Sequence, residues 1–447
     1  MQKVFQEYGG VITTAMAIVA LIGLLGMLFT PGGTGWMDGA FKDVIHGFSD
    51  KVDGAIPGEG AGDSGSDTSG DTSGSNAGTN YTEEEIEADE LLYAVGATVP
   101  EYVVIRFNED YTEAIVTKNG ENSDGIMMDF SHETSPVLAQ SSTINTVVVG
   151  DGVTNVGAFA FSQCYNLTSV TLSNTITSIG ASGFANCRKL TSVSLPDGLI
   201  SIGKSAFEYA PLTSLKIPAS TEILGAKAFR GCTGLANVTI PNRVTSMGDG
   251  VFEKCTSLES ATLSNNLTSL VSSAFEGCTS LSSVTFGGNS QIVSIGNKAF
   301  YGCTALTRLN IPEGVTKIGS SAFDGCTNLT NFVIPDSVTT ILSGAFKNCT
   351  SLTSITVPAL GGDGIGTNAF SGCAALANVT LKEGIKSIGS TAFAGCASLT
   401  SITIPASVTN LADDTFDGSA LTTIYGTIGS RAEIFANANG YTFIAVG

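Results

Sequence analysis

The sequence repeats a unit of about 23 residues from residue 151 onward, Ala-Phe-x-x-Cys-x-x-Leu-x-x-Val-x-Ile-Pro-x-x-Val-Thr-x-Ile-Gly. A unit this short cannot bury an apolar face alone, so each copy must stack on its neighbours. The repeat therefore predicts a solenoid of about twelve coils rather than several globular domains. The repeat phenylalanines are Phe161, Phe184, Phe207, Phe229, Phe252, Phe275, Phe300, Phe323, Phe346, Phe370, Phe393 and Phe416.

The spacing within the unit predicts a mainly β fold. The pattern Leu306-x-x-Leu309-x-Ile311 predicts a short strand whose alternate residues point inward, and Pro312 ends its pairing. Val-Thr-x-Ile-Gly predicts a second extended piece, whose Gly permits the turn before Ala-Phe. The phenylalanines should stack as an aromatic spine.

All ten cysteines lie three residues after a repeat Phe. The units at Phe207 and Phe416 lack this Cys, and only there does Leu follow Phe by five positions instead of six. This covariation favours free thiols that pack the loop and donate weak hydrogen bonds to turn carbonyls. Disulfides between neighbouring coils are the alternative, although parallel Cβ directions oppose their geometry. Zinc is disfavoured because no Cys-x-x-Cys occurs.

The repeat closely resembles the BspA-like (Treponema pallidum-type) leucine-rich repeats of bacterial surface proteins. The similarity covers about residues 147–447, where ten units carry Phe-x-x-Cys-x-x-Leu, and it includes the closing segment around Ile424-Tyr425-Gly426. The resemblance implies a curved right-handed solenoid on a cell surface that serves adhesion or protein binding. Insertions near Gly287–Gln291 and Leu360–Gly364 depart from the pattern, and we expect loops there.

Residues 1–57 are expected to form a transmembrane anchor followed by an amphipathic helix. Residues 9–30 contain no charged side chain, and Val11–Phe29 is long enough as a helix to cross a bilayer. A cleavable signal peptide is the alternative, but no Ala-x-Ala cleavage pattern follows the apolar run. We expect a single span with a cytoplasmic N-terminus and an extracellular solenoid. Glu7-Tyr8 before this run resembles the start of tight-adherence type IVb pilins.

The next two segments connect this anchor to the solenoid. Residues 58–80 contain only Gly, Ser, Asp, Glu, Thr, Asn and Ala, which predicts a disordered linker. Residues 81–150 should form a short acidic helix over 81–93 and a hairpin from residues 102–107 and 111–117. We expect this hairpin to cap the solenoid, which occupies residues 151–447.

Charge and residue usage exclude several functions. The chain has a net charge of −20, with 23 acidic and 5 basic side chains in residues 1–150, so nucleic acid is not an expected partner. Neither of its two histidines lies in residues 151–447. The sequence also lacks a Gly-x-Ser-x-Gly elbow, a His-Glu-x-x-His motif and a phosphate loop. We therefore expect no enzyme activity, cofactor or metal.

The candidate ligand face is the solvent side of the predicted strands. It is rich in Thr and Ser and poor in the Trp, Tyr and Arg that dominate binding hot spots. Ordinary β-propensity of Thr is the competing explanation. The candidate residues are Thr171, Ser194, Thr239, Thr262, Thr285, Arg308, Asn310, Thr356, Thr380, Thr403 and Tyr425.

These features together predict a membrane-anchored cell-surface leucine-rich-repeat protein for adhesion or protein–protein recognition. Its partner would be a protein or glycan on a host or neighbouring cell surface, and residues 9–30 would contact the membrane. The alternative is a pilin-like subunit that assembles through Glu7–Phe29 and displays the solenoid.

Overall fold

The computed structural model describes residues 92–93, 103–120, 123–361 and 364–446. The expected anchor, amphipathic helix and linker, residues 1–80, lie outside these residues. Within the described part of the chain, no helix has the length and apolar character needed to cross a bilayer.

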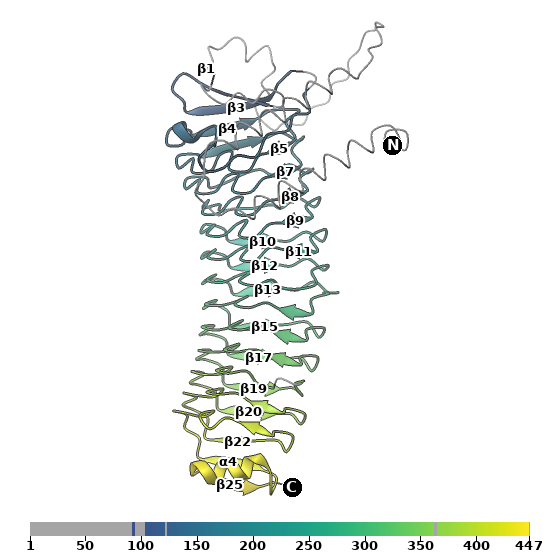
Figure 1. The fold of residues 1–447 in the computed structure, drawn as a ribbon, viewed down its shortest axis with the longest axis vertical. Helices are drawn as coiled ribbons and strands as arrows, with labels where there is room; N and C mark the ends of the chain where they lie inside the picture. Colours follow the sequence, from purple (N-terminus) through teal and green to yellow (C-terminus); the bar gives the residue numbers. More distant parts are fainter. Residues whose placement is uncertain (1–91, 94–102, 121–122, 362–363, 447) are drawn as a thin grey trace, which may run out of the picture. The chain divides into compact units, whose positions relative to one another are not determined.

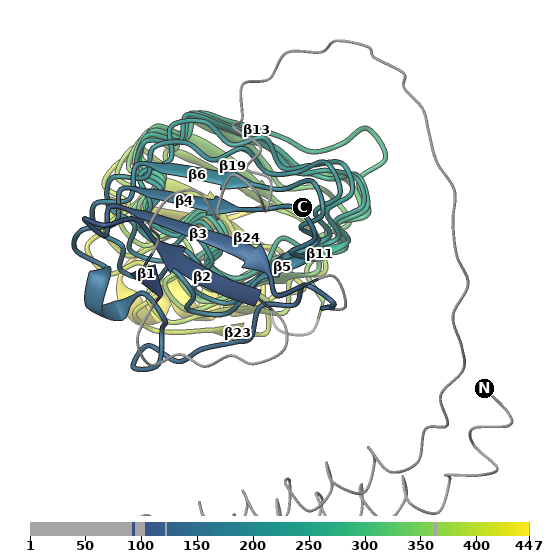
Figure 2. The same cartoon turned by 90° about the horizontal axis from the view of Figure 1, so that it is seen from above.

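The described residues form the mainly β solenoid that the repeat predicts, with about thirteen turns in place of the expected twelve (Figure 1). A coil contains up to two short strands, one in each of two series. The view along the solenoid axis separates the two series (Figure 2). The first series is β4 (Thr146–Val149), β6 (Ser169–Leu172), β10 (Asn237–Thr239), β12 (Ser260–Thr262), β13 (Ser283–Thr285), β15 (Arg308–Asn310), β17 (Asn331–Val333), β19 (Ser354–Val357), β20 (Asn378–Leu381), β22 (Ser401–Thr403) and β24 (Thr423–Gly426). The second series is β5 (Asn155–Val156), β7 (Ser178–Ile179), β8 (Ser201–Ile202), β9 (Ile223–Leu224), β11 (Ser246–Met247), β14 (Ser294–Ile295), β16 (Lys317–Ile318), β18 (Thr340–Ile341), β21 (Ser387–Ile388) and β23 (Asn410–Leu411).

The predicted hairpin is present at the N-terminal end. Strands β2 (Val103–Phe107) and β3 (Glu113–Lys118) pair antiparallel, and β3 pairs in parallel with β4. A short 3-10 helix, η1 (Leu138–Gln140), precedes β4. The prediction of an acidic helix over 81–93 is wrong at its C-terminal end, because Leu92–Tyr93 form a strand, β1, that pairs antiparallel with β2. One edge of β2 pairs with β3, and its other edge has free N–H and C=O groups. Residues 92 and 93 satisfy these groups only when their backbone is extended.

The twelve repeat phenylalanines form the predicted spine. Each is at most 2% exposed, and the rings of adjacent coils stack with centroids 5.2–5.8 Å apart. Helix α4 (Arg431–Asn439) closes the C-terminal end, where Phe435 meets Phe416 edge-on at 5.9 Å. After α4, β25 (Thr442–Ala445) pairs in parallel with β24. The spine thus runs through every coil and ends against the closing helix.

Two positions in most coils adopt a left-handed backbone, two residues before and two residues after Phe. The second position carries Gly in seven coils, but Lys254 occupies it with φ 60° and Tyr209 with φ 60°. Left-handed backbone is unfavourable for residues with a Cβ. These side chains therefore mark strained positions on the turn side of the coil.

The glycine that follows most second-series strands has a different role from the predicted one. Its backbone is not left-handed; instead, it lies against the preceding coil. A Cβ on Gly319 would lie 2.6 Å from the amide nitrogen of Asn297, whereas real Cβ atoms essentially never lie within 3.0 Å of such a non-bonded atom. Close stacking of successive coils, and not turn geometry, requires glycine here.

Candidate recognition face

The first-series strands place the predicted ligand residues in one column along the solenoid. Thr239, Thr262 and Thr285 are cross-strand neighbours in the parallel ladder of β10, β12 and β13. Thr356 is paired with Thr380, and Thr403 with Tyr425, in the same way. We call this set, the residue after the buried centre of each strand, the outer column. The structure thus brings together residues that are about 23 positions apart in sequence.

The exposure of the candidates agrees with their predicted orientation. Thr171 on β6 and the candidates from Thr239 to Thr403 are exposed, whereas Tyr425 is half-buried. Ser194 is exposed but lies in a coil that has no assigned first-series strand. The candidate positions from residue 171 to residue 403 are therefore all exposed, although not every coil forms a first-series strand there.

Hydrogen bonding separates two kinds of threonine on this face. The hydroxyls of Thr168, Thr213 and Thr330, directly after the repeat Leu, donate at 3.2 Å to carbonyls of the preceding coil. The outer-column hydroxyls make no such bond in the described residues. The first group stabilises stacking, whereas the second group is available to a ligand or to water.

The outer column changes character at β15 and β17. Arg308 and Asn310 are exposed on β15, and the register pairs Asn310 with Val333 of β17. Val333 is 70% exposed, in a position that is Thr in most coils. Arg308 has no ion pair within the described part of the chain. Val333 is not among the residues predicted from the sequence, although Val at a position that is Thr in most coils is a visible departure from the repeat.

The cysteines have the structural role that their covariation indicated. All ten are free and fully buried. Nine of them donate to the carbonyl of the repeat Phe one coil earlier; Cys303 to Phe275, at 3.2 Å, is representative. Burial raises the pKa of Cys164, Cys326 and Cys396 to about 12. These thiols therefore stay protonated near neutral pH and are poor nucleophiles and poor metal ligands.

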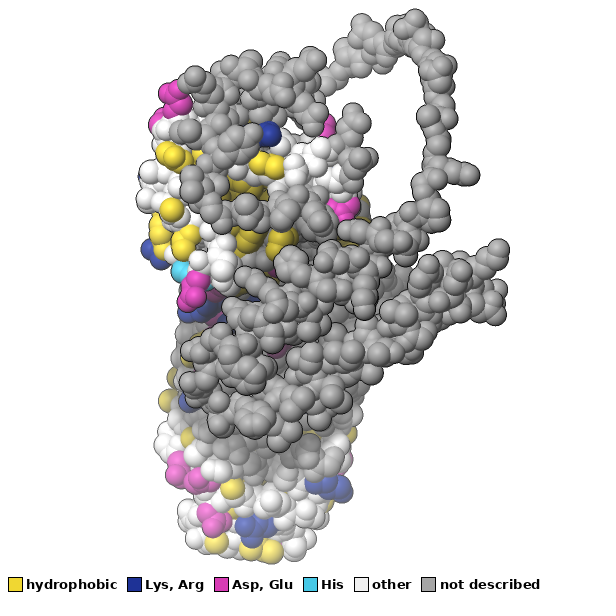
Figure 3. All heavy atoms as spheres, turned by 45° about the horizontal axis from the view of Figure 1, so that its top comes forward, with side chains coloured by type: hydrophobic (Ala, Val, Ile, Leu, Met, Phe, Trp, Pro, Cys, Tyr) yellow, Lys and Arg dark blue, Asp and Glu magenta, His cyan; other side chains and the backbone are white. Residues whose placement is uncertain are grey.

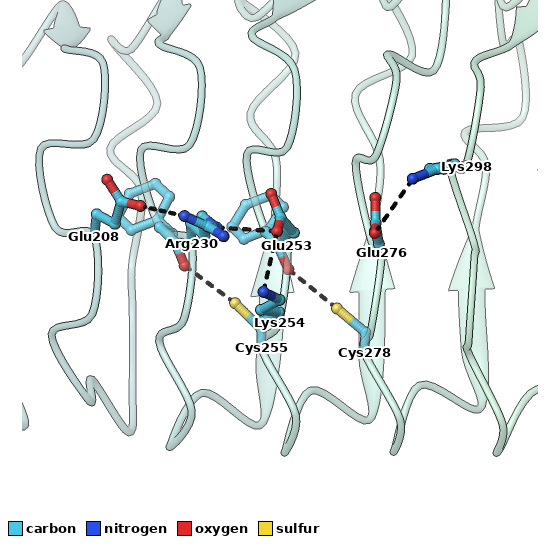
Figure 4. Close-up of polar contacts among 10 residues, drawn as sticks. Glu208, Arg230, Glu253, Lys254, Cys255, Glu276, Cys278 and Lys298 are labelled. Atoms are coloured by element: carbon cyan, nitrogen blue, oxygen red, sulfur yellow. Dashed lines mark hydrogen bonds and ion pairs between the residues drawn. The ribbon is translucent and has the colours of Figure 1, made fainter.

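A charged cluster lies on the turn side of the coils, next to these thiols (Figure 4). The Arg230 guanidinium lies 2.8 Å from a Glu208 carboxylate oxygen and 3.0 Å from one of Glu253. It also lies over the Tyr209 ring, 5.3 Å from its centroid. The three charged side chains are largely buried, so they cross-link successive coils and do not form an open site.

A family model for the BspA type leucine rich repeat region matches residues 137–211, 200–327 and 293–423. These matches span more than half of the chain. The chain belongs to the BspA-type leucine-rich repeat family. Comparison with curated proteins found no match.

Solved structures of bacterial leucine-rich repeat proteins agree with this membership. A protein from Eubacterium ventriosum is 25% identical, with a TM-score of 0.51, over 74% of this chain and 95% of its own. A protein from Bacteroides ovatus is 23% identical, with a TM-score of 0.51, over 79% of this chain and 100% of its own. This BspA-type chain therefore shares its solenoid fold with these two bacterial proteins. The curvature and hand implied by the family resemblance stay predictions.

Proposed function

We propose that this BspA-type protein is anchored in a bacterial membrane through residues 9–30 and recognises a protein on a host or neighbouring cell. Recognition takes place on the first-series strand face and involves no catalysis. The observation that carries the proposal is the outer column of unengaged hydroxyls, interrupted by Asn310 and Val333, with Arg308 exposed on the same strand as Asn310. Val333 is the cross-strand neighbour of Asn310, and Arg308 lies two residues before Asn310 on β15. This part of the face therefore offers apolar contact and a charged hydrogen-bond donor.

The scaffold supports this role because it holds the face rigid. The Phe spine and the ladder of buried thiols fix each coil, so the face loses little conformational entropy on binding. Thr and Ser side chains around the Arg308 site would form a polar rim. A glycan of the partner cell could contact the same hydroxyls, but Val333 favours a protein.

In situ photo-crosslinking tests the face. A photoreactive amino acid at position 333 should cross-link to a partner protein on mixed cells, whereas one at Lys317, exposed on the second series, should not. The substitutions Arg308→Ser and Val333→Thr restore repeat-like side chains and should abolish cross-linking from a neighbouring position, Asn331. Equal yields from positions 333 and 317 would contradict the proposed face.

A pilin-like subunit is the second candidate, favoured by Glu7-Tyr8 at the start of the apolar run. In that case residues 7–29 would assemble into a filament that displays the solenoid. Fractionation separates the two: an anchored protein is recovered in detergent-soluble membranes, and a pilin is recovered in sheared filaments.

A further inference from the structure

The solenoid has a basic surface that lies away from the strand face. In each coil a turn segment connects the second-series side to the next repeat Leu and contains the repeat Phe and, in ten coils, the Cys. The turn segments at residues 180–190, 203–212 and 225–235 carry five cations and one acid, a net charge of +4 in a chain of net −20. The five cations are Arg188, Lys189, Lys204, Lys227 and Arg230.

Packing does not require most of these cations. Thr or Ala occupies the position of Arg188 in most coils, and the hydroxyls of Thr304 and Thr350 there donate to carbonyls of the preceding coil. Arg188 and Lys189 are instead exposed, as is Lys204, while Lys227 is partly exposed. Among the described residues these four have no ion-pair partner, whereas Arg230 is held by two carboxylates.

Two exposed tyrosines lie among the cations. Tyr165 is 40% exposed, and the Arg188 guanidinium lies over its ring, 5.6 Å from the centroid. The Tyr165 hydroxyl donates to Gln163, which in turn contacts His132. Figure 3 shows Lys and Arg side chains close to the histidine at this end of the molecule. Tyr209, 38% exposed, lies two coils further along and stacks on Arg230.

We propose that this Tyr–Arg–Lys surface docks an acidic segment of a partner protein, rich in Asp and Glu. The four unpaired cations complement carboxylates, and tyrosine and arginine are the side chains that dominate protein hot spots. The next turn segment, residues 248–258, carries Asp249 and Glu253 against Lys254, a net charge of −1, so the excess of cations is limited to three coils. Three coils span about 10 Å at β-strand spacing, enough for about four extended residues.

The test uses the full chain and a fluorescein-labelled octapeptide of alternating Asp and Glu, measured by anisotropy at low salt. The variant R188T/K189S/K204S/K227S gives these positions repeat-like Thr and Ser. We expect it to bind the peptide about tenfold more weakly, with a shallower salt dependence. Circular dichroism checks that all variants stay folded.

The matched control, K216S/K317S/K347S/K386S, removes four cations outside the surface. It should bind within about twofold of wild type if the local surface, and not net charge, determines affinity. Equal weakening in both variants would overturn the proposal. Preference of the wild-type chain for a sulfated glycan, heparin, over the acidic peptide would also overturn it, because it would indicate a different class of partner.

Discussion

The close approach of successive coils predicts that Gly319→Ala destabilises the solenoid. Gly319 is buried, and its amide donates at 2.9 Å to the Ile295 carbonyl one coil earlier. An added Cβ would lie 2.6 Å from both the Asn297 nitrogen and the Gly296 carbonyl carbon. Contacts below 3.0 Å are not tolerated, and since both atoms are backbone, the coils must move apart.

Three coils of the same protein already show what this movement does. Glycines at this position hold the corresponding hydrogen bond at 2.7–3.0 Å. Leu342 keeps the bond at 3.0 Å and Ala412 lengthens it to 3.3 Å. Val271 forms no such bond to Met247, and the second-series ladder is interrupted between those coils. A Cβ here therefore weakens the ladder to a degree that depends on the coil.

The magnitude follows from two opposing terms. An unsatisfied buried N–H costs about 1–3 kcal/mol. The reduced freedom of the unfolded chain on replacing Gly by Ala offsets about 0.4–1 kcal/mol. We therefore expect Gly319→Ala to lower the free energy of unfolding by roughly 1–2 kcal/mol.

Guanidinium unfolding followed by circular dichroism measures this loss, and amide hydrogen exchange locates it. Protection should fall at residue 319 and in the two coils that contact it. The reverse substitution, Val271→Gly, should raise protection at residue 271 by allowing the missing bond to form. A Gly319→Ala protein as stable as wild type, or more stable, would contradict this reasoning. The only effect left would then be the reduced conformational freedom of the unfolded chain.

Three further predictions follow from the core and the turn side. Phe323→Ala should lower the free energy of unfolding by about 3–5 kcal/mol, because its buried ring stacks on Phe300 and Phe346; calorimetry measures this. Burial raises the pKa of Cys326 from 9.0 to about 12, so its stabilising contribution is complete below pH 9 and is lost as the pH rises toward 12. The denaturation midpoint should fall across that window, and less steeply in Cys326→Ala. Lys254→Gly should stabilise by about 0.5–1 kcal/mol in urea unfolding, because it relieves a left-handed backbone at φ 60°.

Repeat spacing predicts most of the fold because each constraint recurs in every coil. The regular interval between phenylalanines predicts the aromatic spine. The covariation of Cys with the longer loop predicts the thiol hydrogen bonds. The role of glycine was not predictable, because the contact that requires it joins residues 23 positions apart through the backbone. The strand at Leu92–Tyr93 depends in the same way on a distant partner, the edge of β2.

The candidate face was predictable in position but not in chemistry. The repeat pattern placed Thr168, directly after Leu167, and Thr171, directly after Val170, both toward solvent, and both are exposed. Only in the folded structure is it evident that the Thr168 hydroxyl donates to the preceding coil while that of Thr171 does not. Val333 is not predictable from side-chain polarity; only its departure from the repeat, Val where most coils have Thr, marks it.

Protease shaving of intact cells, with mass spectrometry of the released peptides, tests most directly that the solenoid is displayed for recognition. We expect release of peptides from beyond residue 58, while residues 1–57 stay with the membrane. If intact cells release nothing and lysis exposes the whole chain to protease, the solenoid is internal, and recognition of a partner cell is contradicted.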